Sequence, residues 1–171
     1  MLSYKIIQDP EPSDPRVEND NVGKMICFHR RYRLGDKHEF KTPKEFEDWW
    51  AKQKGIRLPL YLYDHSGLRI STNPFGCPWD SGQVGYIYVT EAKIKEEWGR
   101  NKVKAVSYLQ GEVAEYNQYL SGDIYGYQIR DEDNNLIDSL TGIYGEKEAE
   151  EEAQKALVHL EKKVRAEANL I

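Results

Sequence analysis

Cysteine is scarce in this chain of 171 residues, which contains only Cys27 and Cys77. Two cysteines form at most one disulfide and cannot by themselves supply a four-ligand zinc site. The acidic stretch "DEDNN" (131–135) begins like a calcium loop, but Leu136 and Gly142 stand where that loop needs glycine and glutamate. The sequence therefore predicts two free thiols, no metal site and no cofactor.

Long apolar runs are also absent, because none approaches the roughly 20 residues that a membrane-spanning helix needs. The stretch "MLSYKIIQDPEP" at the N-terminus lacks the apolar core of a signal peptide. We therefore expect a cytoplasmic protein that makes no use of a membrane.

A strong excess of charge of either sign is missing as well. The chain has 24 basic and 29 acidic side chains, which gives a formal net charge of −5. This modest acidic balance argues against a general surface for duplex DNA, and it is too small for a DNA mimic. Any electrostatic recognition must come from local patches.

Apolar and aromatic residues are present in the amounts that a folded core requires. Hydrophobic residues make up 39% and aromatic residues 12%, with 12 tyrosines against 4 phenylalanines. A tyrosine packs its ring but still needs a partner for its hydroxyl group, so this composition suits sheet faces, pocket walls and interfaces.

The pattern of apolar residues and turn residues predicts an α+β fold. Strands are expected at 3–8, 24–29, 58–64, 68–72, 83–90, 123–130 and 135–142, and helices at 43–54, 91–98, 101–122 and from 146 onward. The proline-rich segment 9–21 is expected to contain no helix, because each proline disfavours a helical conformation in the residue before it. Strands cluster without strict alternation with helices, so we expect one domain over 1–171 with a mostly antiparallel sheet. About four helices are expected, the last being an amphipathic C-terminal helix over 145–171.

The stretch "PFGCPWDSGQVGYIYV" (74–89) places Cys77 in a tight turn. A cysteine nucleophile needs a helix N-terminus or a histidine beside it, whereas Pro78 and a strand follow Cys77. Residues from neighbouring loops could complete such a site only if the fold brought them together: His29, His65, Asp64 and Asp80. A packed turn cysteine is the favoured interpretation, and a Cys77-dependent hydrolase is the third functional hypothesis.

The segment 24–41, "KMICFHRRYRLGDKHEFK", combines basic and aromatic side chains. Six basic residues against two acidic ones leave a local charge of +4. Such a combination suits a platform for single-stranded nucleic acid, on which bases stack and phosphates are neutralised. The alternative function is therefore a single-strand binder that uses Arg30, Arg31, Tyr32 and Arg33. A solvated loop that pairs with the protein's own carboxylates is the ordinary interpretation.

The aromatic side chains also suggest a protein interface. Four tryptophans and alternating tyrosines such as Tyr61 and Tyr63, or Tyr86 and Tyr88, exceed what one modest core requires. Aromatic residues and arginine dominate the binding energy of many interfaces. If helices cover these tyrosines, they belong to the core instead.

Three parts of the sequence resemble a family of small uncharacterised proteins that bacterial phages, prophages and plasmids encode. The parts are "DPRVENDNVGKMICFHRRYRLGDKHEF", "LPLYLYDHSG" with "CPWDSGQVGYIYV", and "YLSGDIYGYQI". The resemblance extends to about Gly145 and carries no activity or site residues. It implies a mobile-element context, in which small acidic proteins often act as anti-defence proteins, including anti-CRISPR inhibitors.

The expected function is accordingly binding rather than catalysis, with a host defence nuclease of the CRISPR type as the partner. Acidic loops would face the positively charged nucleic-acid channel of that host protein. The predicted partner-binding residues are acids of the N-terminal loop and of the last helix: Asp14, Glu18, Asp20, Glu148, Glu151 and Glu152. The sequence leaves the oligomeric state open.

Overall fold

The structure is a computed structural model that describes residues 1–168, and over these it has five helices and seven strands in two antiparallel sheets. This confirms the α+β class and the antiparallel pairing. The chain divides into two compact units, which we describe separately: unit 1 comprises Met1–Ser13 and the chain from Gly122 onward, and unit 2 comprises Asp14–Ser121. The assignment of 1–171 to one domain stays a prediction.

Unit 2 contains a four-stranded sheet in the order β2-β5-β3-β4. Its strands are β2 (Lys24–Cys27), β3 (Gly55–Asp64), β4 (Leu68–Ser71) and β5 (Ser81–Thr90). The expected hairpin between β3 and β4 is confirmed. Its turn is polar and places Ser66 (φ 54°) and Gly67 (φ 138°) in the positive-φ region that a tight turn requires.

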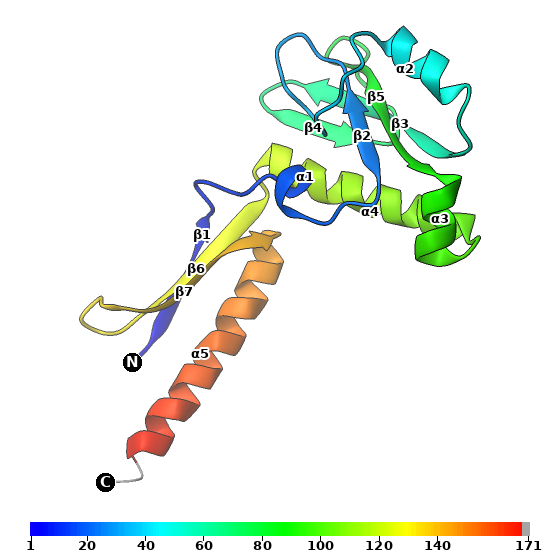
Figure 1. The fold of residues 1–171 in the computed structure, drawn as a ribbon. Coiled ribbons are helices and arrows are strands. Elements are labelled where there is room, and N and C mark those ends of the chain that lie inside the picture. Colours follow the sequence, from blue (N-terminus) through cyan, green and yellow to red (C-terminus); the bar gives the residue numbers. More distant parts are fainter. Residues whose placement is uncertain (169–171) are drawn as a thin grey trace. The chain divides into compact units, whose positions relative to one another are not determined.

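Helices cover both faces of this sheet, as Figure 1 shows for α2 (Pro43–Trp50) and α4 (Lys102–Ser121). Successive strand residues point to opposite faces. Ile87 and Val89 of β5 therefore join the core beneath α4, while Tyr86 and Tyr88 lie under Phe46 of α2, with ring centroids 5.4 and 5.8 Å away. The helices thus cover this pair of tyrosines, whereas Tyr61 and Tyr63 of β3 remain half-buried.

The two helices that open with threonine begin where the sequence predicts. Thr42 accepts a hydrogen bond from the backbone N–H of Glu45 at the start of α2, and Thr90 does the same for Lys93 at the start of α3 (Glu91–Trp98). Threonine at this position satisfies a backbone donor that the helix itself leaves free. Helix α2 ends at Trp50, four residues earlier than expected.

The expectation that segment 9–21 contains no helix is wrong, because Pro15–Glu18 forms the short helix α1. Asp14 is extended (φ −70°, ψ 115°), as a residue before proline should be, and this is also the conformation of a helix N-cap. Its side chain accepts a 2.8 Å hydrogen bond from the N–H of Arg16. Pro15 then occupies the first helical position, where its missing N–H costs nothing.

The side chain of Arg16 is buried and fixes α1 against the rest of unit 2. Its guanidinium donates to Asp36 at 2.9 and 2.8 Å, to Glu112 of α4 at 2.7 Å and to the carbonyl of Gly23 at 2.8 Å. Burial lowers the pKa of Arg16, but the hydrogen bonds to Asp36 and Glu112 outweigh it and leave the pKa raised. Each buried charge in this cluster is therefore paired.

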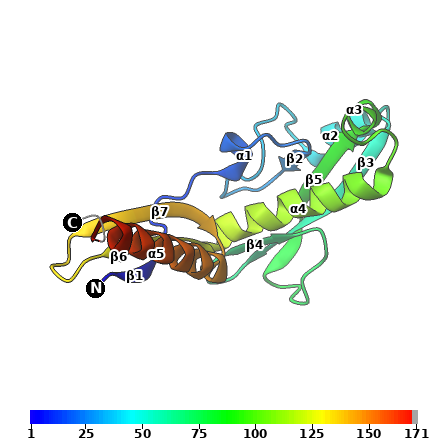
Figure 2. The ribbon, with the colours of Figure 1, turned by 90° about the horizontal axis from the view of Figure 1, so that it is seen from below.

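Unit 1 is a three-stranded antiparallel sheet, in the order β1-β6-β7, with one helix on it. Its elements are β1 (Ser3–Gln8), β6 (Ile124–Arg130), β7 (Leu136–Tyr144) and α5 (Glu146–Ala168). Figure 2 shows α5 running along these strands, and its buried Ala153 packs with Tyr127 and Ile129 of β6. The C-terminal helix is confirmed over the described residues, and 169–171 lie outside them.

Candidate functional site

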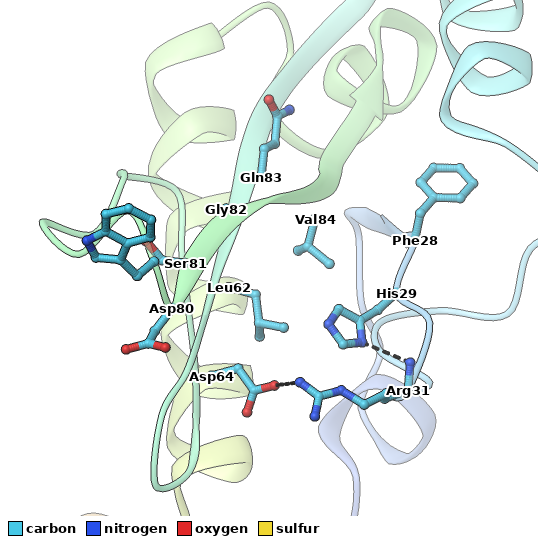
Figure 3. A pocket seen from close by; sticks show the side chains of 11 residues that line it. Phe28, His29, Arg31, Leu62, Asp64, Asp80, Ser81, Gly82, Gln83 and Val84 are labelled. Carbon is cyan, nitrogen blue, oxygen red and sulfur yellow. Dashed lines mark hydrogen bonds and ion pairs between the residues drawn. The ribbon is translucent and has the colours of Figure 1, made fainter.

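A hollow of about 310 Å³ lies in unit 2 where β5 begins, β3 ends and the chain leaves β2 (Figure 3). Leu62 of β3 and Val84 of β5 line its floor, but each is only 5% exposed, and most of the surface of the hollow is polar. Its rim is polar and carries charges of both signs. The rim residues come from three segments that are distant in sequence: His29, Arg31, Asp64 and Asp80.

The hollow exists because β2 is shorter than the strand beside it. The pairing of β2 ends at Cys27, opposite Gly85, and one further hydrogen bond joins the N–H of Phe28 to the carbonyl of Val84 at 2.8 Å. The first residues of β5 extend past this point with β3 on one side only. The register between β3 and β5 also shifts between Leu60 and Tyr61, which bends the sheet at the hollow.

One carboxylate, that of Asp64, organises the rim. One of its oxygens accepts a hydrogen bond from the guanidinium of Arg31 at 2.7 Å (Figure 3). The other accepts one from the hydroxyl of Tyr32 at 3.4 Å. The Arg31 side chain is 71% exposed and that of Asp64 is 23% exposed. The pair holds the segment after β2 against the end of β3, although so exposed an ion pair adds little to stability.

Hydrogen bonds and aromatic stacking hold the ring of His29 in place. Its Nδ1 accepts hydrogen bonds from the backbone N–H groups of Arg31 and Tyr32, both at 3.2 Å, so Nε2 carries the proton in this arrangement. The ring also stacks on Tyr32 with centroids 5.0 Å apart, and the guanidinium of Arg31 lies 5.5 Å from the centre of the Tyr32 ring. The basic segment therefore presents an ordered aromatic and cationic surface.

Trp79 stands beside this hollow, in the connection from β4 to β5, and 92% of it is exposed. A tryptophan normally buries most of its large ring, so exposure of this degree leaves apolar area without cover. The sequence shows four tryptophans but not which of them the fold leaves outside. Only the pairing of the strands on either side of this connection determines the position of Trp79.

Cys77 lies near two of the residues expected to complete a catalytic site, but not in a catalytic arrangement. Its thiol is 3.7 Å from Oδ2 of Asp80, and Nδ1 of His65 is 3.3 Å from the same oxygen. An activated thiol needs a positive charge or an imidazole beside it, and the group beside Cys77 is the negatively charged carboxylate of Asp80. The backbone carbonyl of Cys77 accepts a hydrogen bond from the hydroxyl of Ser81, so Cys77 belongs to a hydrogen-bonded turn.

The residues predicted for nucleic-acid binding lie on one segment but differ in their surroundings. Arg30 and Arg33 are exposed, and neither forms an ion pair with any described residue. Arg31 is paired with Asp64, as the ordinary interpretation of this loop expects. Two of the three arginines are therefore free to meet a partner.

The predicted acidic contacts fall in both units. In unit 2, Asp14 is half-buried and serves as the N-cap of α1, while Glu18 and Asp20 are exposed on the surface. On α5 of unit 1, Glu151 lies 3.7 Å from Lys147 and Glu152 lies 2.7 Å from Lys155. Glu148 is exposed and has no ion pair among the described side chains.

Within residues 1–168, no group of three or more His, Cys, Asp or Glu side chains is arranged to hold a metal ion. In the same part of the chain, no helix combines the length and apolarity needed to cross a bilayer. Comparison of the chain with protein families, characterised proteins and solved structures finds no match. The site therefore has to be interpreted from its own geometry.

Proposed function

We propose that the protein acts by binding another protein through the Trp79 surface, which consists of Trp79, His29, Arg31, Tyr32 and Asp80. The observation that carries this proposal is the 92% exposure of Trp79 beside a preformed hollow. Tryptophan, tyrosine and arginine are the residue types that contribute most to binding energy at protein interfaces. The hollow, whose surface is mostly polar, also offers a pocket for a polar side chain of a partner.

The mixed charge of the rim favours a protein over a nucleic acid as the partner. Asp64 and Asp80 stand within the same hollow as Arg31, and each would repel a phosphate backbone that followed the arginines. A protein surface carries both signs of charge and can complement such a rim. The order already present in His29 and Tyr32 lowers the entropy cost of association.

The partner that the family resemblance implies is a host defence nuclease of the CRISPR type in the cytoplasm of a bacterium. Inhibition by contact with its nucleic-acid channel would use exposed acids of the same unit, Glu18 and Asp20. Both are free of ion pairs within the described chain, so their charge is available to a basic channel.

The experiment is affinity capture of the tagged protein from bacterial lysate, with and without nuclease treatment, followed by mass spectrometry. The wild type and Trp79→Ala are compared with Val103→Ala, a matched control at an apolar residue of unit 2 that is 80% exposed. We expect one protein at stoichiometric amounts with the wild type and the control after nuclease treatment. Its recovery should fall about tenfold or more with Trp79→Ala.

Two results would contradict the proposal. Equal recovery with Trp79→Ala would remove the Trp79 surface from the interface. Recovery that depends on intact nucleic acid, falls with Arg30→Ala and Arg33→Ala and declines steeply with salt would favour the single-strand binder instead. The nuclease assignment is tested by measuring nucleic-acid cleavage by the captured protein. The wild type should inhibit this cleavage, and the double variant Glu18→Lys with Asp20→Lys should inhibit it less.

A further inference from the structure

The outer edge of β7 in unit 1 pairs with no other strand of the described chain. The sheet order β1-β6-β7 leaves β7 at an edge, and six of its nine residues are exposed. Leu136, Ile137 and Leu140 are 50%, 45% and 47% exposed, and Asp138 is the one charged residue of the strand. Natural edge strands are usually guarded by lysine, proline or other charges, because an apolar free edge pairs readily with another strand.

The regular part of this edge is short and well defined. The ladder between β6 and β7 runs without a break from Tyr127–Leu140 to Ile129–Asp138, and register shifts lie on either side of it. Residues directly opposite in a ladder point to the same face. Leu140 and Asp138 therefore share the α5 face of the sheet with the buried side chains of Tyr127 and Ile129.

The flank of α5 that lies toward β7 follows from one hydrogen bond at the opposite margin of the sheet. Gln154 donates a 3.3 Å hydrogen bond to the hydroxyl of Tyr4 in β1, so this side of α5 lies toward β1. Glu152 lies two residues earlier, about 200° around a helix of 3.6 residues per turn, and is therefore on the β7 side. The pKa of Tyr127 is raised by burial, by its hydrogen bond to Asp138 and by the charges of Asp138 and Glu152.

Five charged or titratable positions line this β7-facing flank, because their spacing returns to one side of a helix with 3.6 residues per turn. They are Glu148, Glu152, Lys155, His159 and Lys163. The flank begins with the acids Glu148 and Glu152 and is basic from Lys155 onward, and Lys155 pairs with Glu152 at 2.7 Å. Glu148, His159 and Lys163 have no ion pair with any side chain of residues 1–166.

We propose that a second copy of this chain pairs its β7 with β7 in antiparallel fashion, about a two-fold axis that passes through Asp138–Leu140. The two sheets then form one six-stranded sheet with both α5 helices on the same face. The two-fold axis makes these helices antiparallel, so the acidic half of each β7-facing flank lies opposite the basic half of the other. The inference rests on unit 1 alone and is independent of the proposed function.

The charge order of α5 is what favours a second copy over an unrelated strand. A flank that changes from acidic to basic along its length complements itself only when reversed, and antiparallel edge pairing produces that reversal. The pairing also covers the apolar edge of β7 with the equally apolar edge of the other copy. It places Leu140 of one copy opposite Asp138 of the other.

The first test is the mass of the full chain in solution, measured by light scattering and analytical ultracentrifugation over a range of concentrations. We expect a dimer for the wild type. Leu140→Asp should weaken it at least about tenfold, because it places each new carboxylate opposite Asp138 of the other copy, and like charges directly opposite are destabilising. Val103→Asp places the same charge on an exposed residue of unit 2 and should leave the dimer intact.

The second test exchanges the charges of the flank. Glu148→Lys with Glu152→Lys makes the whole flank basic, and His159→Glu with Lys163→Glu leaves Lys155 as its one basic residue, so each variant alone should be monomeric. An equimolar mixture of the two should form a heterodimer. A monomeric wild type, or a dimer that persists in Leu140→Asp and in both charge variants, would overturn the proposal. Circular dichroism on each variant establishes that it is folded.

Discussion

The guanidinium of Arg16 donates a 2.7 Å hydrogen bond to the carboxylate of Glu112, which lies ninety-six residues later in the chain. Both side chains are almost fully buried, at 1% and 7% exposure. The other oxygen of Glu112 accepts from the backbone N–H groups of Val22 and Gly23 at 2.8 and 3.0 Å. One ion pair therefore joins the N-terminal segment of unit 2 to the long helix α4.

Loss of the Arg16 cation should strongly destabilise unit 2. Arg16→Met leaves Asp36 and Glu112 as unpaired carboxylates in the interior, and breaking a buried ion pair in this way costs about 3–5 kcal/mol. Urea unfolding followed by circular dichroism measures the change. The matched control is Arg31→Met, which breaks an ion pair of the same 2.7 Å length at the surface and should cost under about 1 kcal/mol. Equal losses in the two variants would refute this account.

The two thiols should differ sharply in reactivity. Cys27 is buried, and burial followed by the charge of Asp36 raises its pKa to about 12, whereas Cys77 is half-buried in a surface loop. Since the thiolate is the reactive form, a thiol reagent at pH 8 should modify one cysteine per native chain and the second only after unfolding. Cys77→Ser should remove the fast phase, and two fast thiols in that variant or in the wild type would contradict the prediction.

Stability should be lost at alkaline pH. Burial raises the pKa of Cys27 from 9.0 and of Tyr116 from 10.0, each to about 12. Both groups are held neutral in the folded state, so their contribution is complete below about pH 9. It is lost as the pH rises toward 12, because the unfolded chain releases these protons first. Urea unfolding at pH 8, 10 and 11 measures the fall.

Tyr116→Phe is the control for this pH dependence. The hydroxyl of Tyr116 accepts a 2.9 Å hydrogen bond from the N–H of Gly35, so the variant should lose about 1 kcal/mol at neutral pH. Its stability should then fall less between pH 8 and pH 11 than that of the wild type. A fall of unchanged size would show that Tyr116 does not carry the effect.

Elements with local signals were predictable from the sequence. Thr42 with Pro43, and Thr90 with Gly99, mark helix ends through groups that satisfy nearby backbone atoms. Gly122 (φ 74°) follows the end of α4 and Gly145 (φ 95°) precedes the start of α5. Both have a positive φ, at which a residue with a side chain would be strained. The two hairpins follow from polar turns between apolar strands. In each case the decisive atoms lie within a few residues of one another.

Features that depend on distant contacts were not predictable. Helix α1 does have a local signal, since Asp14 and Pro15 are typical N-cap and first-turn residues, but the burial of Arg16 against Glu112 depends on another element. The hollow requires the unequal lengths of β2 and β5, which only the register of the sheet defines. The residues next to Trp79 in the sequence do not indicate whether its ring is covered or exposed. Tertiary packing alone determines these features.

The order of segments in unit 1 determines when its sheet can form during protein synthesis. Its sheet joins β1, from residues 1–13, to strands that follow residue 122, and all of unit 2 lies between them. During synthesis, β1 must therefore wait for its partner β6 while 108 residues (14–121) are added, which takes roughly 5–20 seconds at roughly 5–20 residues per second. Unit 2 is continuous and can fold within that interval. The apolar side chains of β1, including Ile6 and Ile7, remain without their sheet until the second half of unit 1 emerges.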